Sequence, residues 1–300
     1  MNFLSSQFNF HKLRIQESWC HHGNRGKRLY SLCSGYFWFF RTKISKKPKI
    51  VSVFENMKFK CYTDSAHAMS YFFNGTEYDN WNIMKFIDKI LMPGDRFVDI
   101  GANVGLITLL ASSKIGANGS IISIEPISKN VTRLKENIKL NNLKNIDILH
   151  IGLSDEPGEF NFSNEDVSSH MKEVSDHNTE VVKVLELDTV LQNQTEAYNV
   201  TKIDVEGMEL LILKGAEESI KKNLLPVIII EVNGLHERFG ILRDDISDFL
   251  IKKNYVFGRY NHDYKTLCLD SQLHEDTIAI NKDYLGFISA RFKELKITYK

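Results

Sequence analysis

The sequence predicts an α/β fold built on a mostly parallel, doubly wound sheet, and three observations lead to this prediction. From about residue 96 onward, short apolar segments that suit strands alternate with segments whose apolar residues recur at helical spacing. The segment 225–232 is almost entirely apolar, as expected for a strand buried on both faces. Acidic residues directly follow several strand-like segments. Repeated strand–helix units form a parallel sheet between helical layers, so the carboxyl ends of the strands meet at one edge.

The first predicted elements are a hairpin and a helix. The segments 50–54 and 59–63 are typical of strands, and they flank a polar turn at 55–58. Apolar residues then recur at helical spacing over 81–91, and Pro93-Gly94 ends this helix.

The alternating part of the chain supplies the predicted sheet. Its strands are expected at 96–100, 120–125, 146–153, 200–205, 225–232, 255–260 and 277–280. The helices are expected at 104–114, at 127–141, shortly after 206 and around 246–250. Between the third and fourth strands, 159–162 and 181–184 are expected to pair. The polar loop 163–180 that joins them has no periodicity, and such loops in compact domains are often lids or binding loops.

Charge is unevenly distributed along the chain. The 38 Lys/Arg balance the 38 Asp/Glu, but residues 1–50 hold ten Lys/Arg and one acid, so they carry +9 and the remainder carries −9. This predicts a basic appendage that contacts an anionic membrane surface or a partner protein, or that is simply a solvated tail. The acidic remainder argues against nucleic acid as a partner.

Localisation follows from what the sequence lacks. No apolar run approaches the roughly 18 residues that a membrane-spanning helix needs. The N-terminus also lacks the basic start and the following apolar stretch that a signal peptide has. The four cysteines are scattered without a CxxC pair, so neither a disulfide framework nor a zinc module is indicated. A cytoplasmic protein with reduced cysteines is expected, with peripheral membrane contact through its basic part.

The turn after the first strand, Asp-Ile-Gly-Ala-Asn-Val-Gly at 99–105, has the composition of a ligand site. It differs from the dinucleotide fingerprint GxGxxG, and an acid at Asp99 would repel phosphate but suit a cation. Glu125, which ends the second strand, can accept hydrogen bonds from ribose hydroxyls. A ligand with ribose, positive charge and no phosphate is S-adenosylmethionine. Gly101 and Gly105 would then admit it closely; the alternative is that these glycines only permit a tight strand–helix turn.

More polar residues follow the fourth and fifth strands. Asp204, Glu206, Glu231, Asn233 and His236 would converge near a methyl acceptor. Glu206 and Glu231 are expected to hydrogen-bond the acceptor, and His236 to take its proton. The alternative for Asp204 and Glu206 is that they cap the following helix.

So many acids in one cleft repel each other, and three resolutions are open. In the first, one carboxyl is protonated. In the second, Lys202 neutralises the acids because it shares a strand face with Asp204. In the third, a divalent cation such as magnesium binds among them.

These segments also carry a resemblance. FVDIGANVG, IISIEP, LKENIKLNN, IGLSD, KIDVEGMELLILKGA and VIIIEVN, in this order and spacing over about residues 75–235, resemble the FkbM family of S-adenosylmethionine-dependent methyltransferases. GTEY at 75–78 resembles the upstream motif of that family. The resemblance implies a class I methyltransferase fold with a Rossmann-like sheet of seven strands, and O-methylation of sugars or polyketide-like natural products.

The resemblance also implies cofactor contacts and a domain plan. The cofactor residues would be Asp99, Gly101, Asn103, Gly105 and Glu125, with Ser154 and Asp155 near the adenine. The expected organisation is a basic extension at 1–49, a lead-in hairpin and helix at 50–92, the methyltransferase domain at 93–290 and a tail at 291–300.

Two other classes of function remain open at this level. A non-catalytic module could keep the S-adenosylmethionine pocket and regulate or scaffold a glycan-building partner, but it would not need the acids after strands four and five. A nucleic-acid methyltransferase is disfavoured because no Asn-Pro-Pro-aromatic motif follows the fourth strand. The favoured expectation is an O-methyltransferase acting on a sugar, glycolipid or related metabolite.

Overall fold

The computed structural model describes residues 13–75, 81–163, 179–292 and 294–299. Contacts divide the chain into two compact units, Met1–Met84 and Lys85–Lys300. The expected boundary at residue 49 therefore falls inside the first unit, and the limits of independently folding domains stay a prediction. Most of the expected lid, as well as the residues Thr76 to Tyr78 of the upstream motif, lies outside the described residues.

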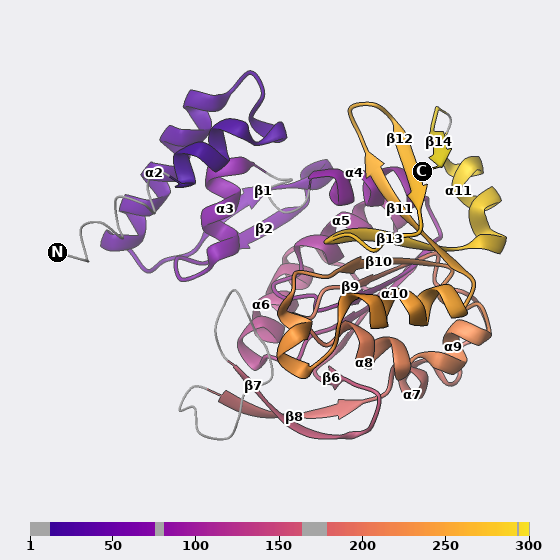
Figure 1. Cartoon of the computed structure of the whole chain (residues 1–300). Coiled ribbons are helices and arrows are strands. Elements are labelled where there is room, and N and C mark those ends of the chain that lie inside the picture. Colours follow the sequence, from indigo (N-terminus) through magenta and orange to yellow (C-terminus); the bar gives the residue numbers. More distant parts are fainter. Residues whose placement is uncertain (1–12, 76–80, 164–178, 293, 300) are drawn as a thin grey trace. The chain divides into compact units, whose positions relative to one another are not determined.

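The first unit contains helices α2 and α3, a helical segment at residues 13–20 and a hairpin (Figure 1). The predicted hairpin is confirmed, since β1 (Lys49–Ser52) pairs antiparallel with β2 (Lys58–Cys61) around the short 3-10 turn η2 (Phe54–Asn56). Helix α2 (Arg28–Ile44) follows the 3-10 turn η1 (His22–Asn24) and packs on α3 (Ala66–Asn74). The ring of Trp38 stacks on Phe72 with centroids 4.3 Å apart.

The second unit contains the predicted sheet, which has nine strands within the described residues. In sheet order they are β14 (Lys296–Tyr299), β12 (Thr266–Asp270), β11 (Tyr255–Asn261), β13 (Asp276–Asn281), β10 (Val227–Glu231), β9 (Val200–Ile203), β3 (Arg96–Ile100), β4 (Ser120–Ile124) and β5 (Ile146–Leu149). The run from β5 to β11 is the expected doubly wound sheet of seven strands. Strands β12 and β14 extend it, so residues 291–300, expected to be a tail, contribute a strand to the sheet.

One strand prediction was too long. The apolar segment 146–153 was expected to be a single strand, but it divides into β5 and β6 (Gly152–Leu153). Strand β6 belongs to a separate three-stranded sheet with β8 (Thr179–Leu185) and β7 (Gly158–Ser163), of which the β7–β8 hairpin was predicted. The third strand of the main sheet therefore ends at Leu149, and residues after Leu153 are not at its carboxyl end.

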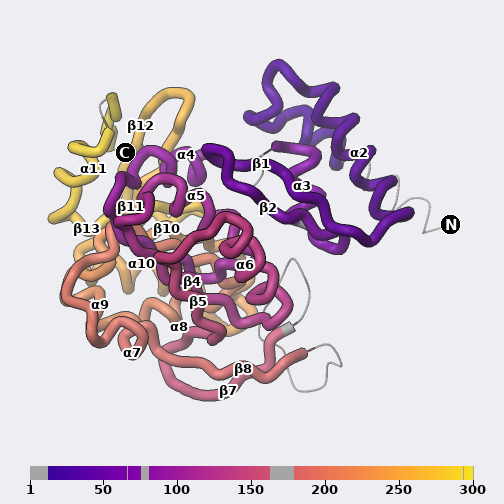
Figure 2. Tube along the Cα trace, turned by 180° about the vertical axis from the view of Figure 1, so that it is seen from behind, coloured from indigo at the N-terminus to yellow at the C-terminus, as the bar shows by residue number. Residues whose placement is uncertain are grey.

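Helices cover both faces of the sheet, as Figures 1 and 2 show from opposite sides. Helices α5 (Leu106–Ile115) and α6 (Ser128–Leu140) contact β3, β4 and β5. The other face carries α8 (Glu209–Lys214) and α10 (Arg243–Lys252). The remaining elements of this unit are α4 (Trp81–Ile90, which begins in the first unit), α7 (Leu187–Leu191), α9 (Glu217–Lys221), η3 (Leu235–Phe239), η4 (Lys282–Tyr284) and α11 (Leu285–Arg291).

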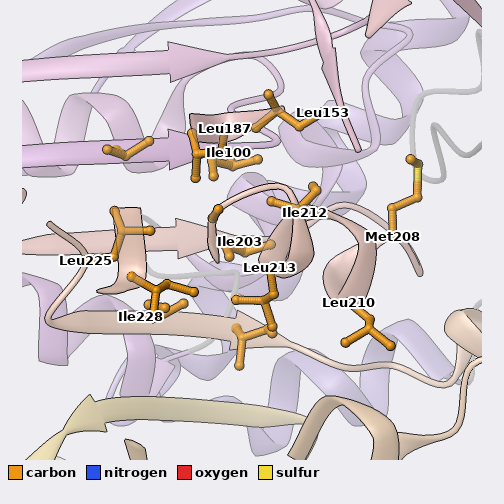
Figure 3. Packing of buried hydrophobic residues seen from close by; sticks show 14 of the residues in the cluster. Ile100, Leu153, Leu187, Ile203, Met208, Leu210, Ile212, Leu213, Leu225 and Ile228 are labelled. Atoms are coloured by element: carbon orange, nitrogen blue, oxygen red, sulfur yellow. The ribbon is translucent and has the colours of Figure 1, made fainter. Parts of the chain in front are cut away.

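The core of the second unit joins the strands of the sheet to helices α8 and α10. Ile100, Ile203 and Leu213 belong to this buried apolar cluster, part of which Figure 3 shows. Burial of apolar surface contributes about 25 cal/mol per Å² to stability, so the cluster stabilises the packing of these helices on the sheet. None of the helices in the described ranges is long and apolar enough to cross a bilayer.

Candidate functional site

The residues directly after five neighbouring strands lie in one row along the carboxyl edge of the sheet. The pairing of neighbouring strands aligns one residue of each strand, directly before this row. These aligned residues are Leu149, Ile124, Ile100, Ile203 and Ile230. The row itself, called the edge row below, consists of His150, Glu125, Gly101, Asp204 and Glu231. The structure thus brings together four residues that sequence reasoning placed at a site, because parallel strands in register end side by side.

Asp99 lies two positions before the edge row and is completely buried, at 0% exposure. It is aligned with Ser123 and Lys202 on the neighbouring strands, and its Oδ2 accepts a hydrogen bond of 2.5 Å from the Thr108 hydroxyl of α5. Burial raises the pKa of Asp99, while the charge of Lys202 opposes this shift. Asp99 was expected to face the ligand, but it lies under the turn and supports it.

Lys202 lies between the buried Asp99 and Asp204 of the edge row, and its charge acts on both. Its side chain is 7% exposed, and Nζ lies 2.5 Å from Oδ2 of Asp204. A buried charge needs a partner because desolvation is costly. Lys202 supplies positive charge next to both Asp99 and Asp204, which corresponds to the second of the three resolutions that the sequence left open.

The two glycines of the 101–105 turn each meet a neighbouring part of the protein. Gly101 has φ +78°, and a Cβ there would lie 1.9 Å from the carbonyl oxygen of Asp204. Gly105 has φ +92°, and a Cβ there would lie 2.5 Å from Cδ1 of Leu134. The close approach that glycine permits at these positions is therefore made by the loop after β9 and by helix α6. The expected close approach of a cofactor is not needed to explain them.

Glu125 is 3% exposed and holds the turn in place. Its Oε2 accepts from the backbone N–H of Asn103 at 2.8 Å, and its Oε1 accepts from Ile127 N at 3.0 Å and Asn130 Nδ2 at 3.2 Å. Burial raises the pKa of Glu125 to about 7, although these donors act against the shift. A carboxylate has about four acceptor positions, so roughly one remains for a ligand hydroxyl, where two bonds to ribose were expected.

Glu206 has an unusual backbone conformation for its residue type. Its φ is +57°, in the left-handed region that glycine favours. Its Oε2 accepts a hydrogen bond of 2.9 Å from Nδ2 of Asn233, which comes from the loop after β10. Burial raises the pKa of the half-buried Glu206 carboxyl. Strained residues that are held in place by their surroundings concentrate at functional sites, so this geometry favours an active role for Glu206 over simple helix capping.

His236 lies behind this loop and not at its surface. Its exposure is 2%, and a Cβ on Gly207 would lie 2.9 Å from its backbone nitrogen. Burial lowers the pKa of the imidazole, so the neutral ring is favoured. A base must come within hydrogen-bond reach of the proton that it removes, and burial of the ring is unfavourable for this role. The role of His236 as the base stays a prediction.

Ser154 and Asp155 are not part of the edge row. A Cβ on Gly215 would lie 2.1 Å from the Ser154 carbonyl oxygen, so this pair packs at the end of α8 that is far from the Asp204 loop. The strand preceding them belongs to the second sheet, and their place near an adenine stays a prediction. His150 takes the corresponding place at the edge. It is exposed, and its Nε2 lies 2.9 Å from the Pro126 carbonyl oxygen.

Glu209 is a further residue that sequence reasoning missed. It is 1% exposed, its Oε1 accepts from Gly207 N at 2.8 Å, and its Oε2 has no hydrogen-bond donor among the described residues. Burial raises its pKa to about 7. The sequence does carry a signal for this residue, because Glu209 is an acid at the first position of an otherwise apolar helix. A carboxyl group at that position can accept hydrogen bonds from the backbone N–H groups of the preceding turn.

We expect Glu209→Gln to flatten the pH dependence of stability. The folded pKa is raised, so the native state holds a proton between about pH 4.5 and 7 that the unfolded state has lost. Stability therefore falls as pH rises through this window, by up to about 3 kcal/mol from Glu209, and Glu125 adds a similar fall. Glutamine keeps the bond to Gly207 without titrating. The free energy of unfolding, measured by urea titration at several pH values, should show the smaller slope.

Glu237→Gln is the control for this measurement, because it also removes a negative charge but at an exposed position. It should leave the slope as in the unaltered chain. Equal slopes in Glu209→Gln and the unaltered chain would contradict the prediction.

A metal site is not apparent in the part of the chain that the structure describes. No group of three or more His, Cys, Asp or Glu side chains there is arranged to hold a metal ion. A divalent cation, the third of the resolutions that the sequence left open, therefore lacks such a ligand set among these residues. Lys202 occupies the position next to Asp204 that a cation would take.

Comparison with known proteins gives consistent results. Residues 99–257 match the family model of the methyltransferase FkbM domain. Methyltransferase 1 of Beauveria bassiana is 26% identical over 177 residues, which are 49% of this chain and 70% of that protein. The hexuronic acid methyltransferase AglP of Haloferax volcanii is 26% identical over 184 residues, which are 56% of this chain and 72% of that protein. The crystal structure of an FkbM methyltransferase from Methylobacillus flagellatus has 16% identity and a TM-score of 0.43, covering 71% of this chain and 52% of that one.

Proposed function

The chain belongs to the FkbM methyltransferase family, and from this premise we propose that it transfers a methyl group from S-adenosylmethionine to a hydroxyl group of a sugar or glycolipid. The observation that carries the proposal is the edge row, with Glu206 and Asn233 joined beside it by a 2.9 Å hydrogen bond. A sugar acceptor is supported by the relative in Haloferax volcanii, whose name describes a hexuronic acid methyltransferase.

The charges at the edge suit a cationic methyl donor. Asp204, Glu206 and Glu231 supply carboxyl groups there, against the one buried ammonium of Lys202. The loops after β9 and β10 are thus more negative than positive, which favours a sulfonium and an ammonium group over a phosphate. Glu125 keeps roughly one acceptor position for a ribose hydroxyl. These groups fit S-adenosylmethionine, which supplies a methyl group that is electrophilic because it is attached to a sulfonium.

Glu206 is the group that we assign to the acceptor hydroxyl. A neutral hydroxyl is a weak nucleophile, so a base must accept its proton as the new C–O bond forms. The raised pKa of Glu206 makes its carboxylate a stronger base than an ordinary glutamate. The Asn233 amide holds one carboxylate oxygen, which orients the other. Because the ring of His236 is buried, we propose Glu206 as the base in preference to the histidine.

A transfer assay tests the proposal. The full chain, incubated with S-adenosylmethionine labelled in the methyl group and with glycan or glycolipid fractions of a cell extract, should place label in an acid-stable ether in one fraction. Glu206→Gln protein is the matched control and should transfer far less. Binding of the donor by calorimetry without transfer to any fraction would favour the non-catalytic module, and failure to bind the donor would contradict the proposed function altogether.

A further inference from the structure

Helix α2 presents a continuous apolar face to solvent. The large side chains on this face are Leu29 (71% exposed), Tyr30 (74%), Phe37 (67%), Phe40 (62%) and Ile44 (89%). Cys33 is also exposed and lies among them by helical spacing. At 100° per residue these six positions fall within about 100° of arc. Single exposed apolar residues are common on proteins, but a contiguous apolar patch marks an interaction surface.

The opposite face of α2 is the one that packs into the first unit. Its buried residues are Ser31, Gly35, Trp38 and Thr42. A Cβ on Gly35 would lie 2.4 Å from the Phe73 ring, so α3 lies directly against the backbone there. The Ser31 hydroxyl donates to Asn24 Oδ1 at 2.7 Å in a buried polar contact. The helix is therefore held in place by this face, and the exposed apolar face is not needed for its packing.

Basic residues surround the exposed face. Between Ser18 and Phe54 the chain carries eight Lys/Arg and no Asp or Glu: Arg25, Lys27, Arg28, Arg41, Lys43, Lys46, Lys47 and Lys49. Of these, Arg28 and Lys43 lie on α2 outside the apolar arc, and Lys46 and Lys47 directly follow the helix; all four are exposed. Cations beside an apolar helical face match the two layers of an anionic bilayer surface, where acyl chains lie beneath negatively charged headgroups.

We propose that α2 docks the protein on an anionic lipid surface, with Leu29, Phe37, Phe40 and Ile44 entering the headgroup region and the flanking Lys/Arg contacting lipid phosphates and carboxylates. The helix lies in the plane of the surface, because it is too short and too polar to cross a bilayer. A second copy of this chain is the less suitable occupant, since it would bring two sets of like-charged residues together. The proposal does not depend on the methyltransferase assignment.

Co-sedimentation with vesicles tests the docking. The full chain should bind vesicles of equimolar phosphatidylcholine and phosphatidylserine at least tenfold more strongly than vesicles of phosphatidylcholine alone, and added salt should weaken the binding. Phe37→Ser/Phe40→Ser should reduce the partition coefficient at least tenfold. Lys46→Glu/Lys47→Glu should reduce it about tenfold on the anionic vesicles only. The matched control is Tyr264→Ser/Tyr299→Ser, which removes two aromatic residues of similar exposure, 76% and 77%, and should change binding less than twofold.

A second readout does not depend on altering the aromatic residues. An environment-sensitive dye on Cys33, in a Cys20→Ser background, should shift its emission to the blue when anionic vesicles are added. Equal binding to neutral and anionic vesicles, or no binding to either, would overturn the proposal. It would also be overturned if sedimentation velocity found a dimer that Phe37→Ser/Phe40→Ser dissociates, since the face would then join two copies.

Discussion

Gly101→Ala is expected to lower the free energy of unfolding by about 2–5 kcal/mol and to abolish measurable donor binding. Alanine adds a Cβ that would lie 1.9 Å from the Asp204 carbonyl oxygen, and backbone must move to accept it. Overpacking of this kind costs about 1–3 kcal/mol, and the left-handed φ of +78° adds about 1–2 kcal/mol for a residue with a Cβ. The movement would displace the loop that carries Glu206. Urea unfolding and calorimetry with S-adenosylmethionine measure the two effects.

Gly94→Ala separates the contact from the backbone strain. Gly94 has φ +89°, close to that of Gly101, but nothing lies within 4 Å of the position of its Cβ. This variant should cost only the conformational part, about 1–2 kcal/mol, and should bind donor normally. If the two variants were equally stable, the contact between Gly101 and Asp204 would not be the reason for the glycine.

Glu206→Gln is expected to lower the turnover number by about 10²–10⁴-fold, the usual contribution of a positioned base. Glutamine has nearly the same shape, and its carbonyl oxygen can still accept from Asn233 Nδ2, but it takes up no proton. Donor affinity should fall much less than turnover, because Asp204 and Glu231 still supply negative charge at the edge. Steady-state kinetics with the acceptor fraction identified in the transfer assay, and calorimetry with the donor, give the two quantities.

The pH dependence of the transfer rate tests independently whether Glu206 is the base. The pKa of Glu206 is raised by burial, so the reactive carboxylate forms only as pH rises through that raised value. The rate of the unaltered chain should fall on acidification below this pKa, and the residual rate of Glu206→Gln should lack this limb. Glu237→Gln, at an exposed position of the neighbouring loop, should keep both rate and profile. A large loss of turnover in His236→Ala together with an active Glu206→Gln would return the base to the histidine.

The overall plan of the second unit could be predicted from the sequence, because it depends on local patterns. The alternation of apolar strands and amphipathic helices encodes which residues are buried, and a doubly wound sheet is the arrangement that buries them all. The positions of Glu125, Asp204 and Glu231 followed directly, since each comes just after an apolar strand and parallel strands end at one edge. Strand β14 was missed because its four residues are largely exposed and carry no such pattern.

What the tertiary structure decided concerns contacts between segments far apart in sequence. The segment 146–153 is continuous in its apolar pattern, yet pairing with β4 and then with β8 divides it between two sheets, so that His150 and not Ser154 follows the third strand of the main sheet. The apolar pattern of the strand that carries Asp99 does not show by itself whether the Asp99 side chain is buried. Its burial depends on Thr108 from α5 and Lys202 from β9.

The turn at 99–105 shows most directly which features the sequence predicts and which are decided by tertiary packing. Its two glycines could be read from the sequence as places of close approach, because only glycine tolerates that backbone and that proximity. Which groups approach could not be read, since Asp204 and Leu134 are distant in sequence and reach the turn only when β9 and α6 pack beside it. Local sequence encodes the backbone conformation that a segment can adopt and the side that it buries. The partner on that side is set by the packing of whole elements, which is a property of the folded chain.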